Sequence, residues 1–127
     1  MSAFHRILSA AAVLLSLIPG ARAQLVPPSN DDCVNAIVVG DGTVSGTTIG
    51  STISTNGCGL SGLTPDVWYS YTATRTGLLA LDTCGSSFDT SITLYGFCGG
   101  PQLVCNDDAP QGAPCGFGGF DSYLTYS

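Results

Sequence analysis

The sequence predicts an all-β protein: an antiparallel β-sandwich of jelly-roll type, stapled by disulfides. Short segments of alternating apolar and polar residues recur along the chain, and turns that hold many of its 17 glycines separate them. After residue 23 the chain has neither lysine nor glutamate, which commonly cover helix surfaces. All six cysteines lie in that same part, and an even number of cysteines is typical of a disulfide framework.

The first elements are expected before the tryptophan. Residues 24–30 contain two adjacent prolines and indicate an extended lead-in. Residues 34–39 form an apolar run suited to a first strand. Residues 40–50 alternate threonine, valine and isoleucine with glycine, which predicts a second strand. The polar, glycine-rich residues 51–65 indicate a loop tethered by its cysteine.

The strongest strand signal covers residues 66–74. Its side chains alternate between a face with Tyr69 and Tyr71 and a face with Trp68. Residues 77–82 follow after a short turn, so we expect them to pair with this strand as a hairpin.

Three more strands are expected near the C-terminal end. Residues 89–95 alternate clearly, residues 101–105 suit a short edge strand, and residues 120–126 begin a final strand after the Gly/Pro/Asp-rich loop 106–119. Since the chain stops just after this last strand begins, we expect that the closing strands of the domain are missing and that the sequence is a fragment.

The first 23 residues are typical of a secretory signal peptide. A start with His5 and Arg6, an apolar stretch over residues 7–18 and small residues at positions 21 and 23 predict cleavage after Ala23. The alternative is a membrane anchor, but the apolar stretch is shorter than the ~20 residues that span a bilayer. We expect a secreted or cell-surface protein with one domain over residues 31–127.

The part after residue 23 is strongly acidic. Arg75 is its only base and nine aspartates oppose it, so the formal charge of this part is −8. Such a surface repels phosphate backbones and has no basic patch for anionic lipid, which argues against nucleic acid and membrane partners.

The cysteines allow several connectivities, and the sequence alone does not select one. We favour sequential pairing, because the last two bridges would close short loops of the kind a hairpin allows. The expected bridges are Cys33–Cys58, Cys84–Cys98 and Cys105–Cys115. A zinc site is the alternative, but this part has no C-x-x-C pair and no histidine.

Oxygen-bearing side chains cluster at the ends of the later strands, at Asp82, Asp89, Asn106, Asp107 and Asp108. Calcium takes six to eight oxygen ligands, several of them carboxylates brought together by loops. If these strand ends share one rim, the five side chains form a calcium site. The competing interpretation is that the aspartates only cap turns.

A second candidate site is the aromatic strand. Trp68, Tyr69 and Tyr71 could form a platform for sugar or peptide, although aromatic residues in a central strand more often belong to the core. Arg75, at the strand end, could pair with a ligand carboxylate, but a surface salt bridge is the favoured interpretation.

No catalytic residue is predicted. Without histidine or lysine there is no usual base for a serine or cysteine nucleophile. The run Asp89-Thr90-Ser91 faintly resembles the Asp-Thr-Gly/Ser of aspartic proteases, with Asp82 as its partner, but Asp-Thr at a strand start is common.

An ordered set of motifs resembles the bacterial pre-peptidase C-terminal (PPC-like) domain in its Cys-rich form. These are Asn30-Asp31-Asp32-Cys33, Cys58-Gly59, Asp66-Val67-Trp68-Tyr69, Asp82-Thr83-Cys84-Gly85-Ser86, Phe88-Asp89-Thr90, Cys98 and Cys105-Asn106-Asp107-Asp108. The resemblance implies a jelly-roll sandwich appended to exported proteins, without catalytic activity and with calcium in some members. Phe88-Asp89 with Cys98-Gly99 also resembles, more weakly, the calcium-binding edge of CUB domains.

From the residues and this resemblance we expect a secreted, non-catalytic module for adhesion or for binding extracellular protein or polysaccharide, with calcium as a candidate stabilising ion. It would act as a monomer or as part of a larger chain. The alternatives are a piece of a larger secreted hydrolase or peptidase whose catalytic part is absent, and an aspartate-based hydrolase.

Overall fold

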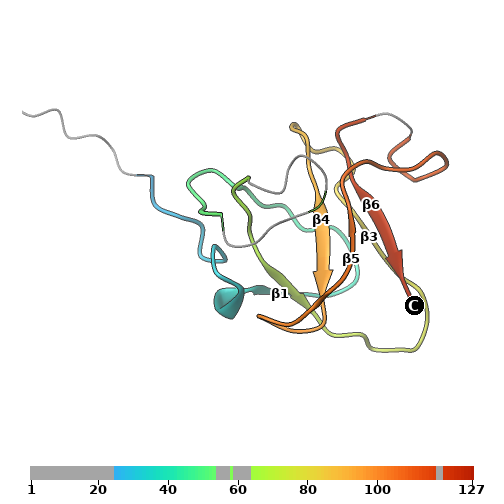
Figure 1. Cartoon of the computed structure of the whole chain (residues 1–127), viewed down its shortest axis with the longest axis horizontal. Coiled ribbons are helices and arrows are strands. Elements are labelled where there is room, and N and C mark those ends of the chain that lie inside the picture. Colours follow the sequence, from blue (N-terminus) through green and yellow to red (C-terminus); the bar gives the residue numbers. More distant parts are fainter. Residues whose placement is uncertain (1–24, 54–57, 59–63, 117–118) are drawn as a thin grey trace, which may run out of the picture.

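The computed structural model describes residues 25–53, 58, 64–116 and 119–127. Within these residues the chain is all-β, as predicted, and its helical content is one 3-10 turn, η1 (Cys33–Asn35). The strands are β1 (Ile37–Val39), β2 (Tyr69–Tyr71), β3 (Leu79–Asp82), β4 (Ile92–Tyr95), β5 (Gln102–Asn106) and β6 (Tyr123–Tyr126) (Figure 1). The predicted signal peptide lies outside the described residues. The described part contains no helix long and apolar enough to cross a bilayer.

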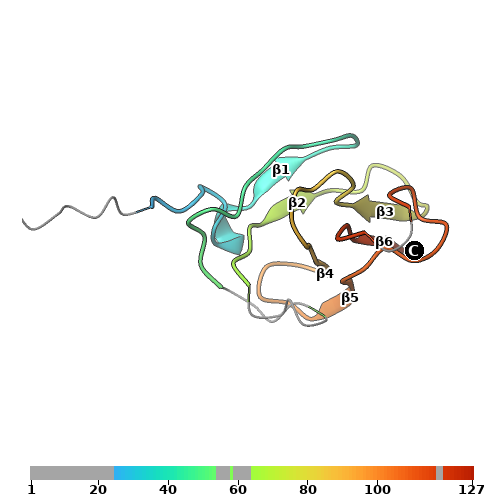
Figure 2. The same cartoon turned by 90° about the horizontal axis from the view of Figure 1, so that it is seen from above.

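The six strands associate as three pairs. β3 pairs with β6 and β4 with β5, both antiparallel, whereas β1 pairs with β2 in parallel. Seen from above, β1–β2 and β4–β5 lie on opposite sides of the molecule and β3–β6 occupies a third side (Figure 2). The parallel pair departs from the antiparallel arrangement predicted. It is feasible because a long connection separates β1 from β2, and parallel neighbours require such a crossover.

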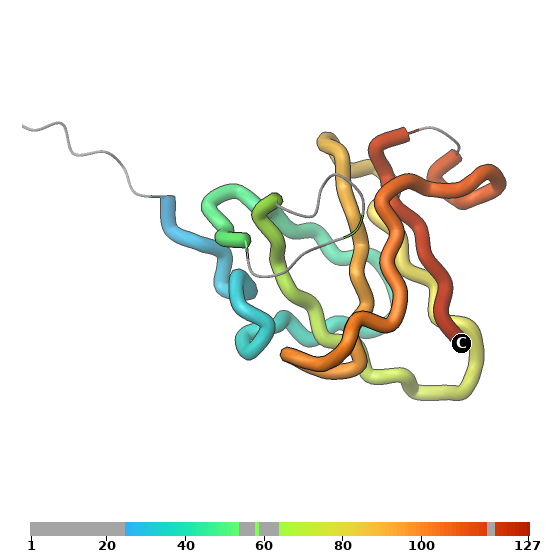
Figure 3. The backbone as a smooth tube through the Cα atoms, in the orientation of Figure 1, coloured from blue at the N-terminus to red at the C-terminus, as the bar shows by residue number. Residues whose placement is uncertain are grey.

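Two local predictions are wrong. Residues 77–82 do not form a hairpin with residues 66–74, because β3 pairs with β6 and β2 pairs with β1. Residues 40–50 contain no strand and follow β1 as a winding path (Figure 3). Their glycines at positions 42 and 50 adopt positive φ, which interrupts an extended backbone.

The disulfide pairing also differs from the sequential one. Cys33 is bonded to Cys98, and Cys84 to Cys115. The predicted bridges Cys33–Cys58, Cys84–Cys98 and Cys105–Cys115 are therefore wrong, and Cys58 and Cys105 carry free thiols. The observed bridges span 65 and 31 residues, since they connect segments that the strand pairing brings together rather than neighbours along the chain.

The apolar core is small. Among the described residues only Ala109 and Leu124 are buried apolar side chains, and several large apolar side chains are exposed, with Val34 and Val38 at 80%. A domain that buries so little apolar surface depends strongly on disulfides and backbone hydrogen bonds.

Of the residues that the structure describes, Ser122 has the most buried side chain, with no exposed surface. Its hydroxyl hydrogen is shared between the carbonyl oxygens of Thr90 and Asp107. Its backbone N–H donates to the Thr83 hydroxyl at 2.8 Å, and its carbonyl accepts from the Thr83 N–H at 3.0 Å. The Thr83 and Thr90 hydroxyls lie 2.6 Å apart. We call these four residues the Ser122 node: Thr83, Thr90, Asp107 and Ser122. The node connects the chain after β3, before β4, after β5 and before β6.

The substitution Ser122→Ala should lower the free energy of unfolding by about 1–3 kcal/mol, because it leaves two carbonyl groups in the node without their donor. Chemical denaturation monitored by tryptophan fluorescence measures this. Ser70→Ala, at an exposed position in β2, is the matched control and should change stability little. Equal stability of the two variants would contradict the importance of the node.

Candidate functional site

Trp68 directly precedes β2 and is held there by its backbone. Its N–H donates to the Asn30 carbonyl at 2.8 Å, and its own carbonyl accepts from the Asn30 side-chain amide at 2.9 Å and from the Ile37 N–H at 3.1 Å. Asn30 is only 4% exposed, so this clamp is shielded from water. The lead-in and β1 thereby fix the position from which the indole projects.

The indole lies beside the Tyr95 ring, which stands at the end of β4. The two ring centroids are 5.3 Å apart and the ring planes are tilted by 43°. Both side chains are half-buried and line an open pocket of about 450 Å³. The rest of the lining is Asp32, Cys33 and Val34 from the start of η1, and Gly99 and Gly100 from the turn between β4 and β5.

A disulfide joins the two walls of this pocket. Cys33 lines it directly, and its partner Cys98 immediately precedes the two lining glycines. Gly99 has φ +75°, a conformation that L side chains rarely adopt, and a Cβ on Gly100 would meet the Phe97 ring. The wall is therefore bare backbone, which leaves the aromatic pair accessible from that side.

Among the described residues that line the pocket, Asp32 is the one charged group. It occupies the position before η1 where a side chain often caps the turn, yet it makes no such hydrogen bond. Its exposed carboxylate can therefore accept hydrogen bonds from a ligand.

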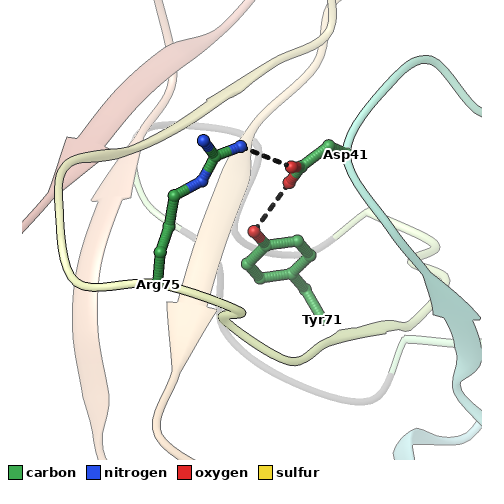
Figure 4. A network of polar contacts seen from close by, with 3 residues as sticks. All are labelled: Asp41, Tyr71 and Arg75. Atoms are coloured by element: carbon green, nitrogen blue, oxygen red, sulfur yellow. Dashed lines mark hydrogen bonds and ion pairs between the residues drawn. The ribbon is translucent and has the colours of Figure 1, made fainter.

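Tyr71 and Arg75 from the predicted binding set lie in a separate surface network with Asp41 (Figure 4). The Tyr71 hydroxyl donates to Asp41 Oδ1 at 2.7 Å, and the Arg75 guanidinium contacts Oδ2 at 3.1 Å. The Tyr71 hydrogen bond, followed by that from Arg75, lowers the pKa of Asp41, and the Asp41 hydrogen bond raises the pKa of Tyr71. The favoured interpretation of Arg75 as half of a surface salt bridge is confirmed.

Tyr69 is exposed and does not line the pocket. Of the four predicted binding residues, the structure thus places only Trp68 in the pocket. Tyr71 and Arg75 contact Asp41 instead. None of the three aromatic residues is fully buried, so the core interpretation does not describe them either.

The predicted calcium ligands have varied surroundings. Asp82 Oδ1 accepts from the Cys84 N–H at 3.1 Å, as in a turn, and Asn106 Oδ1 accepts from the Tyr123 N–H at 3.0 Å. Asp89 and Asp108 are exposed and Asp107 is half-buried. No three carboxylates of the described residues form a tight cluster. The calcium site stays a prediction.

One tight group of possible metal ligands does occur in the described part of the chain, at Asp82, Cys84 and Cys115, whose ligand atoms lie within 4.8 Å of one another. The two sulfurs are bonded to each other, so they offer no thiolate to a metal.

Comparison with known proteins gives one match. Residues 29–112, about two thirds of the chain, match a family described as galactose binding domain-like. The chain belongs to this family. No curated protein and no solved structure matches it significantly.

Galactose-binding-like domains are β-sandwiches, so the predicted sandwich is confirmed, whereas its jelly-roll strand order stays a prediction. They are generally non-catalytic binding modules. The family, together with the disulfides, points to an extracellular or cell-surface protein. The finer resemblances to PPC-like and CUB domains remain interpretations of the sequence.

All the described residues that line the pocket lie within residues 29–112, the part of the chain that matches the galactose-binding-like family. The sequence did not indicate a binding role for Tyr95, and it indicated Asp32, together with Asp31, only as a second candidate for calcium that a turn at the start of the domain explains equally well. The signal for Tyr95 was weak, because an aromatic residue at the end of an alternating strand is equally typical of a core. Asp32 gave a signal shared with turns, since it is one of two adjacent aspartates at the start of the domain.

Replacing Asp41 by asparagine should lower the pKa of Tyr71 back toward its ordinary value, because the carboxylate that disfavours the phenolate is removed. In the unmodified protein the hydrogen bond to Tyr71 stabilises the fold below the ordinary tyrosine pKa and is lost as the pH rises through the raised value. Phenolate ultraviolet absorbance follows the titration, and a Tyr71→Phe protein identifies the signal of Tyr71. An unchanged titration in Asp41→Asn would contradict the network.

Proposed function

We propose that this protein is a secreted, non-catalytic module that binds carbohydrate in the pocket of Trp68 and Tyr95. The observation that carries the proposal is the tilted aromatic pair lining an open pocket beside the Asp32 carboxylate. The pocket volume falls within the ~300–1,000 Å³ typical of small-molecule sites.

The chemistry of the lining suits a sugar. A pyranose ring has an apolar face of C–H groups and an equatorial belt of hydroxyls. The indole and phenol rings offer flat apolar surfaces for the C–H face of the sugar. The indole N–H and the phenol O–H add a polar group at the edge of each ring. The Asp32 carboxylate accepts hydrogen bonds from hydroxyl groups, and ionised acceptors form the stronger hydrogen bonds.

The family supports the same ligand class and the same compartment. Its description refers to galactose-binding domains, and its name associates it with the T9SS, a secretion system. The signal peptide predicted over residues 1–23 and the two disulfides agree with export to an oxidising compartment. Adhesion to glycans of a cell surface or matrix is the role that we propose for such a module.

The substitution Trp68→Ala should weaken glycan binding roughly tenfold, because it removes the main stacking surface of the pocket. Binding is measured by calorimetry with galactose and with galactose-containing polysaccharides, after a glycan array has selected the strongest ligand. Tyr69→Ala is the matched control, since Tyr69 is the adjacent aromatic residue but does not line the pocket. Equal affinities of the two variants, or no glycan bound by the unmodified protein, would refute the proposal.

Removing the Cys33–Cys98 disulfide, which joins the two pocket walls, should also weaken glycan binding. The double variant Cys33→Ser/Cys98→Ser should lose affinity as well as roughly 2–4 kcal/mol of stability. The control Cys84→Ser/Cys115→Ser removes a disulfide that does not line the pocket and should lose stability while keeping its affinity. Both are assayed at a temperature at which circular dichroism shows them folded. The same affinity in both variants would count against this pocket as the binding site.

A further inference from the structure

Two of the six cysteines remain as thiols, and they contact each other. Cys58 lies between β1 and β2 along the chain, and Cys105 lies in β5, where it pairs with Thr93 of β4. A hydrogen bond joins their side chains. Both residues are half-buried, and the Gln102 side-chain amide donates to Cys105 Sγ at 3.2 Å.

The other four cysteines indicate that this protein occupies an oxidising environment. They form the bridges Cys33–Cys98 and Cys84–Cys115, and such bonds persist in compartments that oxidise thiols. A pair of thiols already in contact in that environment has both the partner and the conditions for a bond.

We propose that Cys58 and Cys105 form a third disulfide, which connects the segment between β1 and β2 to strand β5. The oxidant is a disulfide-exchange donor, either a thiol–disulfide oxidoreductase or a small oxidised dithiol. One cysteine thiolate attacks a sulfur of the donor disulfide and releases the first donor thiol. The second cysteine thiolate attacks the cysteine sulfur of this mixed disulfide and releases the second. The protein loses two protons and two electrons, and the donor disulfide is reduced to two thiols.

The surroundings of the pair disfavour the thiolate form of Cys58. Burial, the hydrogen bond to Cys105 and the nearby negative charges of Cys105 and Asp107 raise the pKa of Cys58 to about 12.

The bond would complete a set of three bridges that each join different parts of the fold. Cys33–Cys98 connects η1 to the turn after β4, and Cys84–Cys115 connects the end of β3 to the loop before β6. Neither bridge holds the segment between β1 and β2.

The disulfides are mapped on protein secreted into an oxidising compartment. It is denatured without reductant, treated with a thiol-alkylating reagent, and digested with a protease that cleaves before aspartate, since Arg75 is the only trypsin site after residue 23. That protease leaves Cys98 and Cys105 on one peptide. A second protease, which cleaves after leucine, then separates them at Leu103. We expect no alkylated cysteine and one cross-linked peptide pair that contains Cys58 and Cys105.

Two results would overturn the proposal. One is alkylation of both Cys58 and Cys105 while the other two bridges are intact. The other is a cross-link from either residue to any other cysteine, as sequential pairing would give.

Variants test the bond independently of the map. Cys58→Ser should expose one alkylatable thiol, at Cys105, and Cys105→Ser should expose one at Cys58. The double variant should have no reactive thiol and a Tm lower by roughly 10 °C or more, because a long loop is no longer closed. If the double variant and the unmodified protein, both without reductant, had the same Tm, the proposal would fail. Glycan affinity is not used, so this result is separate from that of the proposed function.

Discussion

The Ser122 node is the constraint on which the arrangement of the strands depends. Where a typical domain would place a cluster of large apolar side chains, this one has three small hydroxyl side chains. The Thr83 and Thr90 hydroxyls are hydrogen-bonded to each other, and the Ser122 hydroxyl is hydrogen-bonded to backbone carbonyls. Because unpaired buried carbonyl groups are costly, each contact in the node requires the others. The node joins the β3–β6 pair to the ends of β4 and β5, so two of the three strand pairs share one anchor.

The positions of strands could be predicted from the sequence, but their partners could not. Alternation is a local property, and it located β3, β4, β5 and β6 within a few residues. Pairing is set by contacts between distant parts of the chain. The same reasoning by proximity proposed both the hairpin of residues 66–74 with residues 77–82 and the short-loop disulfides, and both fail because segments far apart in sequence meet.

The candidate site was predictable in part. Trp68 was a candidate because the aromatic residues of the strongest strand could form a platform for sugar or peptide, and the structure places it in a pocket. Tyr71 was a candidate on the same ground and Arg75 as a partner for a ligand carboxylate, but both contact Asp41, whose position beside them depends on the path of residues 40–50. The alternation of residues 40–50 predicted a strand instead of that path, so the network could not be predicted from the sequence. The approach of Tyr95 to Trp68 joins segments far apart in sequence, so no local pattern indicates it.

The bridge between Cys33 and Cys98 has a consequence for the thermodynamics of recognition. A disulfide is usually considered for its effect on the unfolded chain, yet this one also limits the relative motion of the η1 wall and the Gly99-Gly100 wall in the native protein. A ligand that enters such a preorganised cleft loses less conformational entropy in ordering it, so more of the contact energy remains as affinity. Weak stacking contacts on a small scaffold can then suffice for selective binding.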